Sequence, residues 1–505
     1  MRRTVELRNL HNVMRQPSGT THYPWLIFLL ITLAVFHSAT LRQGHIWADD
    51  FAMYIHHAKN IVEGRPYAQT GYLFTPIAPV GPRMYPPVFP LLLAPVFRFF
   101  GMNLIVMKFE QVIFFVMALS VICLYWQRDL GRKYTIALAA ILGFSPHFWA
   151  AKDNVLSDLP FLLFFYVAAL LVQHAPRDGR TQWPGAILIG IALYLAIGTR
   201  TAGIALLAGL VLYDLLKYRT ITRITVVALP TCAALLLLQS HCIGSEFGSY
   251  NGTFHVTLGT VGAHLISYPR TLAGFWVASS QTAFSFFLLG VVSLLTLVGL
   301  FYQYKRGFTI VEAFLVPYAA IAILWPFSPG IRLLFPVIPW IVFLALTGLR
   351  GLTENFAPRH VSTAVCALLL LISVPFVTAY RHTNFGLIRE STGLPEFNQL
   401  CQAVRERTTS QDVLIYFRAR ALALYTSRAA SAYNYQGTDE ELWQYTHNVH
   451  ATYLITTNAF DEDHGFLARY AETHSPNLEL AYQNANFKLY RIVADAAPLA
   501  SPKSR

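Results

Sequence analysis

The stretch Ile46-Trp47-Ala48-Asp49-Asp50-Phe51 places two adjacent carboxylates just past the first long apolar run, near residues 24–41. It marks the point where a chain built largely of apolar segments first leaves the bilayer. Ionised groups at a membrane boundary are costly unless water, a cation or a substrate satisfies them. Asp49 and Asp50 are therefore the first candidates for chemistry.

The composition predicts a multispanning membrane protein. Of the 505 residues, 55% are hydrophobic and only 13% are charged, whereas a soluble globular protein carries roughly 25% charged residues. The formal charge of +12 does not indicate a nucleic-acid partner, because Lys and Arg form no contiguous basic patch with interleaved aromatic residues. They fall in short clusters between apolar runs, as membrane topology requires.

Eleven apolar segments qualify as membrane-spanning helices, some of them marginally in length. The run at 86–100 is also apolar, but it is short, begins with two prolines and carries Arg98. We predict that it lies at the membrane interface as a helix. The predicted spans are near residues 24–41, 103–126, 134–150, 159–174, 184–198, 201–216, 223–241, 283–303, 308–327, 333–349 and 360–379.

The positive-inside rule supports this assignment. With the N-terminus inside and 86–100 excluded, every predicted inner segment is basic, whereas the short outer turns hold one basic residue each, Lys152, Arg200 and Arg332. Counting 86–100 as a span would move the basic loops outside. The N-terminal run lacks a small-residue cleavage site and reads as an uncleaved first span. We expect a multi-pass protein of the inner (plasma) membrane with a cytoplasmic N-terminus.

The C-terminal part changes character and predicts a small extracytoplasmic α/β domain. Apolar runs at 412–417 and 452–457 favour buried strands, 394–406 and 438–446 have helical spacing, and 478–493, broken at Asn484-Ala485-Asn486, favours a hairpin. The predicted organisation is a transmembrane domain over 1–380 with its first outer loop at 43–102, a soluble domain over 385–494, and a disordered tail over 495–505.

The candidate site residues also have ordinary structural explanations. Asp49 and Asp158 are each suited to cap a helix N-terminus, and Arg200 and Arg332 are suited to snorkel toward lipid headgroups. A single Arg on each of these weakly charged outer turns equally suits a phosphate, because guanidinium presents a planar fork of donors. The histidines, His57 among them, have no spacing typical of a metal site. Whether Cys242 and Cys401 pair stays open.

At these residues the sequence resembles the GT-C superfamily of membrane glycosyltransferases, in the protein O-mannosyltransferase-like branch that includes the lipid A aminoarabinose transferases. The resemblance spans nearly the whole chain, and it rests on the order and sidedness of several motifs. The matching stretches are Trp47-Ala48-Asp49-Asp50-Phe51 through Glu63-Gly64, Tyr85-Pro86-Pro87-Val88-Phe89-Pro90, Leu156-Ser157-Asp158-Leu159-Pro160, Thr199-Arg200-Thr201-Ala202-Gly203 and Ile331-Arg332-Leu333-Leu334-Phe335-Pro336.

The resemblance implies a polyprenyl-phosphate sugar donor and an inverting transfer on the outer face of the membrane. It places the catalytic acidic residues at Asp49, with Asp50 as its support, and at Asp158, and the late-span arginine at Arg332. Asp49 is the expected general base. Phosphate contacts are expected from Arg332, Lys152, Arg83 and Arg200, and donor or acceptor contacts from Tyr54, Tyr85 and His57.

Several alternatives stay open. Tyr85 stands where the aminoarabinose transferases have a Lys, so lipid A is one acceptor among others: another glycan, a protein or a cell-wall polymer. A divalent metal at Asp49 and Asp158 is compatible with the chemistry, but carboxylates alone do not establish it. A secondary transporter or lipid flippase, or a non-enzymatic envelope assembly protein, would also have many spans. Against a transporter, no repeated halves or mid-span charges stand out in the sequence.

Overall fold

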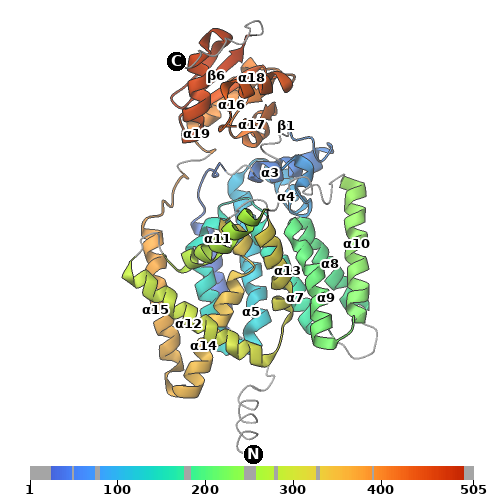
Figure 1. Ribbon diagram of the computed structural model, residues 1–505, viewed down its shortest axis with the longest axis vertical. Helices are drawn as coiled ribbons and strands as arrows, with labels where there is room; N and C mark the ends of the chain where they lie inside the picture. The colour runs from blue at the N-terminus through green and yellow to red at the C-terminus, as the bar shows by residue number, and fades with distance from the viewer. Residues whose placement is uncertain are drawn as a thin grey trace, which may run out of the picture.

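The chain folds into a helical bundle topped by an α/β domain (Figure 1). The computed structural model describes residues 24–47, 50–73, 80–175, 183–243, 257–277, 282–325, 330–388 and 392–493. The bundle contains α2 (Pro24–Ala39), α5 (Leu104–Gly143), α6 (Pro146–Lys152), α7 (Asp158–His174), α8 (Trp183–Thr199), α9 (Ala205–Tyr218), α10 (Arg223–Ile243), α11 (Leu258–Trp276), α12 (Ala283–Arg306), α13 (Ile310–Leu324), α14 (Ile338–Phe356) and α15 (Val361–Arg381).

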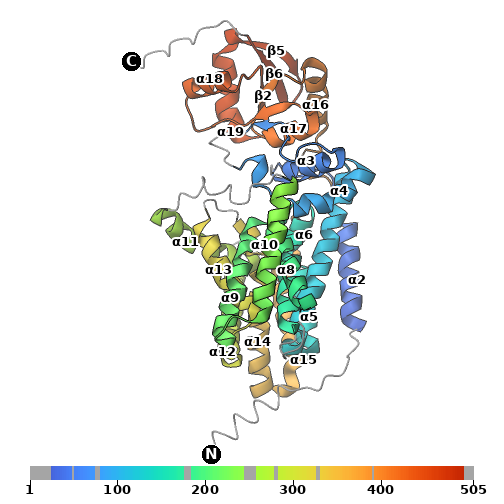
Figure 2. The ribbon, with the colours of Figure 1, turned by 90° about the vertical axis from the view of Figure 1, so that its right-hand side faces the viewer.

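Two helices of the segment predicted as the first outer loop (43–102), α3 (Asp50–Glu63) and α4 (Val88–Phe100), lie between the bundle and the upper domain (Figure 2). They pack against each other, and α4 also contacts α5 and α8. The segment predicted at 86–100 is thus helical from Val88 onward, and it lies at the domain-facing end of the bundle. Short 3₁₀ turns complete this end: η1 (Pro82–Met84), η2 (Thr201–Ile204) and η4 (Gly330–Leu334). A further 3₁₀ turn, η5 (Pro358–His360), joins α14 to α15 at the opposite end of the bundle.

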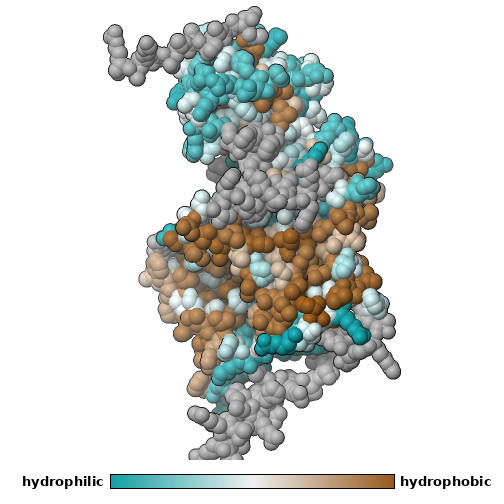
Figure 3. Space-filling model, turned by 45° about the vertical axis from the view of Figure 1, so that its right-hand side comes forward, coloured by the Kyte–Doolittle hydropathy of each residue, from teal (hydrophilic) through white to brown (hydrophobic). Residues whose placement is uncertain are grey.

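Among the described residues, five helices are long and apolar enough to cross a membrane. They cover Leu104–Gly143, Thr201–Tyr218, Arg223–Ile243, Ala283–Arg306 and Pro358–Arg381, and shorter apolar helices accompany them. Figure 3 shows a hydrophobic surface over the bundle and hydrophilic surfaces above and below it. The expectation of a mostly helical membrane protein is confirmed in this coarser form; the expected number of eleven spans stays a prediction.

Helix α5 covers two predicted spans, and its backbone explains why. Gly131 has φ +71° inside it, a conformation that glycine adopts with little steric cost, so two helical segments meet there. The second segment ends at Gly143 rather than continuing to residue 150. Pro146 lacks the amide that would continue the ladder, and the Ser145 side chain caps a separate helix, α6.

The upper domain is built on one six-stranded sheet with the order β1-β3-β2-β4-β6-β5. The pairs β1–β3, β3–β2 and β2–β4 are parallel, and β4–β6 and β6–β5 are antiparallel. The edge strand β1 (Tyr72–Leu73) comes from the first outer loop of the membrane part. The other strands are β2 (Val413–Ile415), β3 (Ala429–Ser431), β4 (Tyr453–Thr457), β5 (Leu478–Gln483) and β6 (Phe487–Ile492).

The predicted strands and hairpin of the C-terminal part are present, and Asn484 forms the turn of the hairpin by accepting bonds from the amides of Asn486 and Phe487. The predicted tail at 495–505 lies outside the described residues. Cys242 and Cys401 are both free, the first exposed and the second buried. The helices of this domain are α16 (Pro395–Arg407), α17 (Ala419–Thr426), α18 (Asp439–Asn448), α19 (Asp461–Asp463) and α20 (Arg469–Thr473), with a π-helical turn, η6 (His464–Ala468), and a 3₁₀ turn, η7 (Ser475–Asn477).

Helices α12 and α14 approach closely through glycines. A Cβ added at Gly299 would overlap the carbonyl oxygen of Leu344, and one added at Gly348 would overlap that of Leu295. Backbone atoms cannot move aside as a side chain can, and small residues are the usual means by which membrane helices come this close. The crossing therefore depends on the absence of side chains at these two positions.

We expect Gly299→Leu to lower the free energy of unfolding by about 1–3 kcal/mol, because it separates α12 from α14. Gly290→Leu, on the same helix, is the matched control, since a Cβ at Gly290 meets no atom within 4 Å. Thermal unfolding of the purified protein in detergent measures both. Equal midpoints for the two variants would contradict the close packing.

Candidate active site

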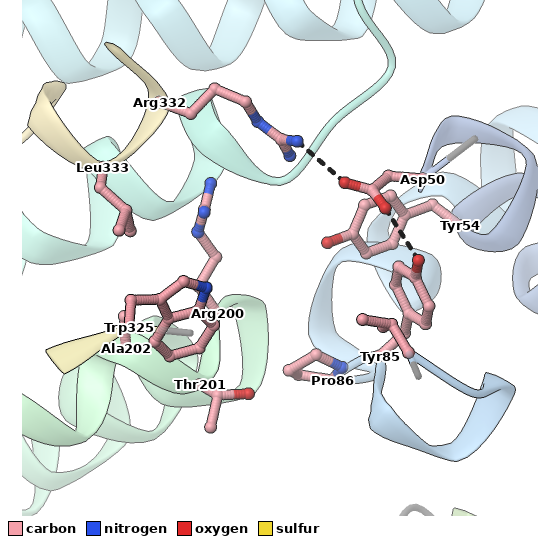
Figure 4. A pocket seen from close by; sticks show the side chains of 11 residues that line it. Asp50, Tyr54, Tyr85, Pro86, Arg200, Thr201, Ala202, Trp325, Arg332 and Leu333 are labelled. Atoms are coloured by element: carbon pink, nitrogen blue, oxygen red, sulfur yellow. Dashed lines mark hydrogen bonds and ion pairs between the residues drawn. The ribbon is translucent and has the colours of Figure 1, made fainter. Parts of the chain in front are cut away.

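Asp50 is the first residue of α3, and its carboxylate points into a cavity at the top of the bundle (Figure 4). One oxygen, Oδ2, accepts a bond from Nη1 of Arg332 at 2.8 Å, and the other, Oδ1, accepts one from the Tyr85 hydroxyl at 2.8 Å. The side chain is 31% exposed. Its orientation is therefore fixed from both sides while it stays accessible from the cavity.

Asp158 holds two arginines in place behind the cavity. It begins α7, is only 4% exposed, and accepts bonds from Nε of Arg332 at 3.0 Å and from Nη1 of Arg200. Arg200 lies in extended backbone between α8 and η2, and Arg332 lies in η4. Two oxygens of one carboxylate thus orient two guanidinium groups from distant parts of the chain, which leaves further donors of both groups for other partners.

The cavity has a volume of about 200 Å³ and a mixed lining. Asp50, Arg200 and Arg332 supply charged groups, Tyr54, Tyr85 and Thr201 supply hydroxyls, and the other lining side chains are apolar. Its lining residues are Asp50, Tyr54, Val80, Tyr85, Pro86, Arg200, Thr201, Ala202, Trp325, Arg332 and Leu333. Such a combination suits a ligand that has an anionic group next to an apolar one.

A third arginine approaches Asp50 from the upper domain. Nη1 of Arg420, in α17, lies 3.8 Å from Oδ1 of Asp50. Around the cavity, three guanidinium groups, those of Arg200, Arg332 and Arg420, thus stand against the two carboxylates of Asp50 and Asp158. This set has a surplus of positive charge, which favours an anionic ligand.

The same charges keep Asp50 ionised. Burial opposes ionisation, but the nearby Arg332 and Arg420, with the bonds from Arg332 and Tyr85, outweigh it and lower the pKa of Asp50 from 3.8 to about 2. Burial and the neighbouring Asp50 raise the pKa of the Tyr54 hydroxyl, so this group is protonated at neutral pH. It contacts the Ser157 hydroxyl at 2.8 Å.

The structure brings together six of the residues that the sequence singled out. Asp50, Tyr54, Tyr85, Arg200 and Arg332 line the cavity, and Asp158 supports its two arginines. Asp49, the expected general base, lies outside the described residues. Tyr85, at the position that the resemblance aligns with a Lys of the aminoarabinose transferases, donates a hydrogen bond to Asp50.

Lys152 lies elsewhere, in a buried cluster beneath the first outer loop. Its ammonium donates to the Thr40 carbonyl at 2.8 Å and to Asp153 at 3.1 Å. Asp153 also pairs with Arg42 at 2.8 Å, and Lys108 donates to the carbonyls of Arg42 and Gly44. This network anchors the start of the loop to α5 and α6, and it explains Lys152 without a phosphate.

Arg83 and His57 also lie outside the cavity lining. Arg83 is exposed on η1. His57 is fully buried, stacks on the Tyr67 ring with centroids 3.9 Å apart, and contacts the Tyr67 carbonyl through Nδ1 at 2.8 Å. Burial is the main reason that the pKa of His57 is lowered to about 4, so the ring is neutral at pH 7 and packs within the loop.

The described residues do not form a metal centre. They include no group of three or more His, Cys, Asp or Glu side chains with metal-binding proximity. Asp158, one of the two carboxylates considered for a metal, has both oxygens engaged by arginines, whose positive charge disfavours a cation at the same position. Asp49, the other of these carboxylates, lies outside the described residues, so a metal at Asp49 and Asp158 stays a prediction.

Arg420 and Trp325 are cavity-region residues that sequence reasoning missed. Trp325 follows the last residue of α13 and lines the cavity, but nothing distinguishes it from other tryptophans at span ends. Arg420 belongs to the soluble domain, where arginine is common and usually solvated. Only the tertiary contact between α17 and the first outer loop identifies it.

We expect the Asp50 ion pair to make stability pH-dependent only in acid. Because the folded-state pKa, about 2, is below the ordinary value of 3.8, the pair's contribution is present above pH 3.8 and is lost as the pH falls toward 2. The difference in thermal midpoint between the wild type and Asp50→Asn should thus be equal at pH 7 and pH 5 and smaller at pH 3. A difference that changes between pH 7 and pH 5 would contradict the assignment.

Comparisons with known proteins give matches in structure only: no family model and no curated protein matches the sequence. A crystal structure of ArnT from Cupriavidus metallidurans bound to undecaprenyl phosphate is similar with a TM-score of 0.57 and 14% identity, covering 95% of this chain and 100% of that one. The Archaeoglobus fulgidus oligosaccharyltransferase in complex with Zn and sulfate gives 0.58 and 12%, covering 85% and 68%.

A third similar structure is the arabinofuranosyltransferase AftD from Mycobacteria, with a TM-score of 0.59 and 13% identity, covering 95% of this chain and 42% of that one. Two of the three are named as transferases of sugars, the oligosaccharyltransferase and the arabinofuranosyltransferase, and identities this low establish the fold alone. The resemblance found in the sequence is confirmed at that level: the chain has the fold of the GT-C membrane glycosyltransferases.

Proposed function

We propose that this protein is a membrane glycosyltransferase that moves a monosaccharide from a polyprenyl-phosphate donor to an acceptor on the outer face of the inner membrane. The observation that carries the proposal is the cavity in which the Asp50 carboxylate faces the guanidinium groups of Arg200 and Arg332. A sugar phosphate needs both kinds of group, an anion site for its phosphate and a base for the incoming acceptor.

The donor phosphate binds between Arg200 and Arg332. Both guanidiniums line the cavity, and Asp158 fixes their orientation, so they need little rearrangement when the charge on the leaving phosphate develops. Pro86 lines the same cavity and lies two residues before the start of α4 at Val88. The polyprenyl tail leaves there along α4, whose Leu91, Phe99 and Phe100 are exposed.

Asp50 is the base in this proposal. The acceptor hydroxyl oxygen attacks the anomeric carbon, the bond from that carbon to the phosphate oxygen breaks, and the hydroxyl proton passes to Asp50, which inverts the anomeric centre. While Arg332 and Arg420 hold it, Asp50 is a weak base. A donor phosphate on Arg332 adds negative charge beside the carboxylate, which raises its pKa toward the range useful for accepting a proton.

We assign the base to Asp50 rather than Asp49 because the Asp50 carboxylate lines the cavity. The preference of the sequence for Asp49 stays a prediction, and substitution separates the two. The candidate acceptors are lipids, glycans and proteins.

We expect a strain without this chain to contain an envelope glycan, glycolipid or glycoprotein that lacks one sugar. The wild-type gene should restore the sugar, and Asp50→Asn should not, because the base is lost while the side chain keeps its shape. Asp49→Asn is the matched control and should restore it at least partly. Mass spectrometry of envelope fractions measures the outcome. If Asp50→Asn restores the sugar fully, Asp50 is not the base. If the wild type restores the sugar and neither aspartate variant does, the base cannot be assigned to Asp50 alone.

We expect Arg200→Ala and Arg332→Ala each to weaken binding of undecaprenyl phosphate by about 10- to 100-fold, since a bond to a charged group is worth about 1.5–3 kcal/mol. Titration of the purified protein measures the affinity. Arg83→Ala is the control, because Arg83 is exposed and outside the cavity lining. An equal loss for Arg83→Ala would move the phosphate site to the η1 loop.

A further inference from the structure

The upper domain is joined to the first outer loop on both sides of Asp50. Before Asp50, the amides of Ile388 and Thr392 donate to the carbonyls of Gln43 and His45 at 3.0 Å each. Trp47, three residues before Asp50, packs edge-to-face on Phe397 of α16, with ring centroids 4.8 Å apart. The segment that leads into the base is therefore held by the soluble domain.

After α3, the same loop becomes part of the domain's sheet. Tyr72 pairs with Ala430 and Leu73 with Ser431 in parallel register, and the Ala430 amide donates to the Gly71 carbonyl at 2.9 Å. Gly71 has φ +69°, and a Cβ there would lie 3.0 Å from the Arg428 carbonyl. A glycine is thus required where the loop meets the domain.

Arg420 is presented to Asp50 by this arrangement. Helix α17 packs on α3, and both ribbon views show the two side by side at the base of the domain (Figures 1 and 2). The Arg420 side chain is 11% exposed, lies 4.8 Å from the Tyr72 ring centroid, and donates through Nη2 to the Val80 carbonyl at 2.8 Å. Its other terminal nitrogen, Nη1, faces Oδ1 of Asp50 at 3.8 Å.

Each oxygen of Asp50 therefore faces a different part of the protein. Oδ2 is held by Arg332 from the bundle, whereas Oδ1 is held by Tyr85 of the loop and faces Arg420 of the domain. Among the described residues, the titratable hydroxyls of Tyr85 and Tyr54 are also near Asp50: Tyr85 donates to it, and the charge of Asp50 helps to raise the pKa of Tyr54. If a donor phosphate engages Arg332, the contacts on Oδ1 remain to keep the carboxylate oriented.

We propose that Arg420 is a positioning residue of the active site, so that the soluble domain completes the site instead of only lying above it. This inference rests on the proposed function, in which Asp50 is the base. Arg420 holds the carboxylate and balances its charge, and the β1–β3 pairing sets the distance between them.

The first test measures the proton linkage of Asp50 and needs no transfer. The thermal midpoint difference between Asp50 and Asp50→Asn is followed from pH 6 to pH 2, in the wild-type and Arg420→Met backgrounds of the full-length protein. Loss of a cation near the carboxylate should move the pH at which this difference declines upward by about one unit. Arg420→Lys keeps the charge and should move it by less than half as much.

Lys59→Met is the matched control for domain contact. Lys59 lies on the same helix as Asp50 and donates to Ser427, just after α17, at 3.4 Å. Its loss therefore weakens the contact between α3 and α17 but leaves the arginines beside Asp50 in place. It should leave the pH dependence unchanged. No shift with Arg420→Met, or an equal shift with Lys59→Met, would overturn the positioning role.

The second test compares binding with transfer. We expect Arg420→Met to lower the transfer rate about tenfold or more, to change the affinity for undecaprenyl phosphate by less than about threefold, and to be partly rescued by Arg420→Lys. A loss of affinity as large as the loss of rate would make Arg420 a phosphate ligand and overturn the proposal. If the wild-type protein transfers no sugar, the proposed function fails, while the pH measurement still decides the role of Arg420.

Discussion

The guanidinium of Arg332 is the interaction on which the candidate site depends. It bonds Asp158 at the start of α7 and Asp50 at the start of α3, and so joins three segments that are far apart in the sequence. Asp158 in turn orients Arg200. A partly buried charge without a partner is costly, so each member of the network makes the position of the others more definite. Asp158 closes the buried side of this network, and Asp50 faces the cavity on the other side. The network therefore determines the charge of the cavity wall.

The two carboxylates of this network differ in burial. Asp158 is almost completely buried and serves the two arginines, whereas Asp50 is partly exposed and faces the cavity. Two carboxylates with the same chemistry therefore have different roles because of their burial. Arg200 and Arg332 also combine two functions: some of their donors bond a carboxylate, and the others are free to bond another partner.

The sequence predicted the site where sidedness was sufficient. Asp50, Asp158, Arg200 and Arg332 all lie on predicted outer turns, and turns on one face of a bundle meet. Lys152 lies on such a turn too, but its neighbour Asp153 and the Thr40 carbonyl bind it inside the protein, and sidedness does not report where a side chain points. Arg420 was missed because its contact with Asp50 spans most of the chain. The span predicted at 134–150 is split because Ser145 caps a new helix and Pro146 begins it. Counting apolar residues alone does not detect this break.

The strand β1 has a consequence for how the protein matures. Leu73 and Ser431, which meet at the edge of the sheet, are 358 residues apart in the chain. During synthesis, the first outer loop emerges long before its pairing strand exists, and it waits unpaired while the remaining spans insert. Arg420 reaches its place beside Asp50 only when the last domain has been made and has folded. A chain that is truncated late, or whose final domain fails to fold, therefore leaves the early loop without its edge partner.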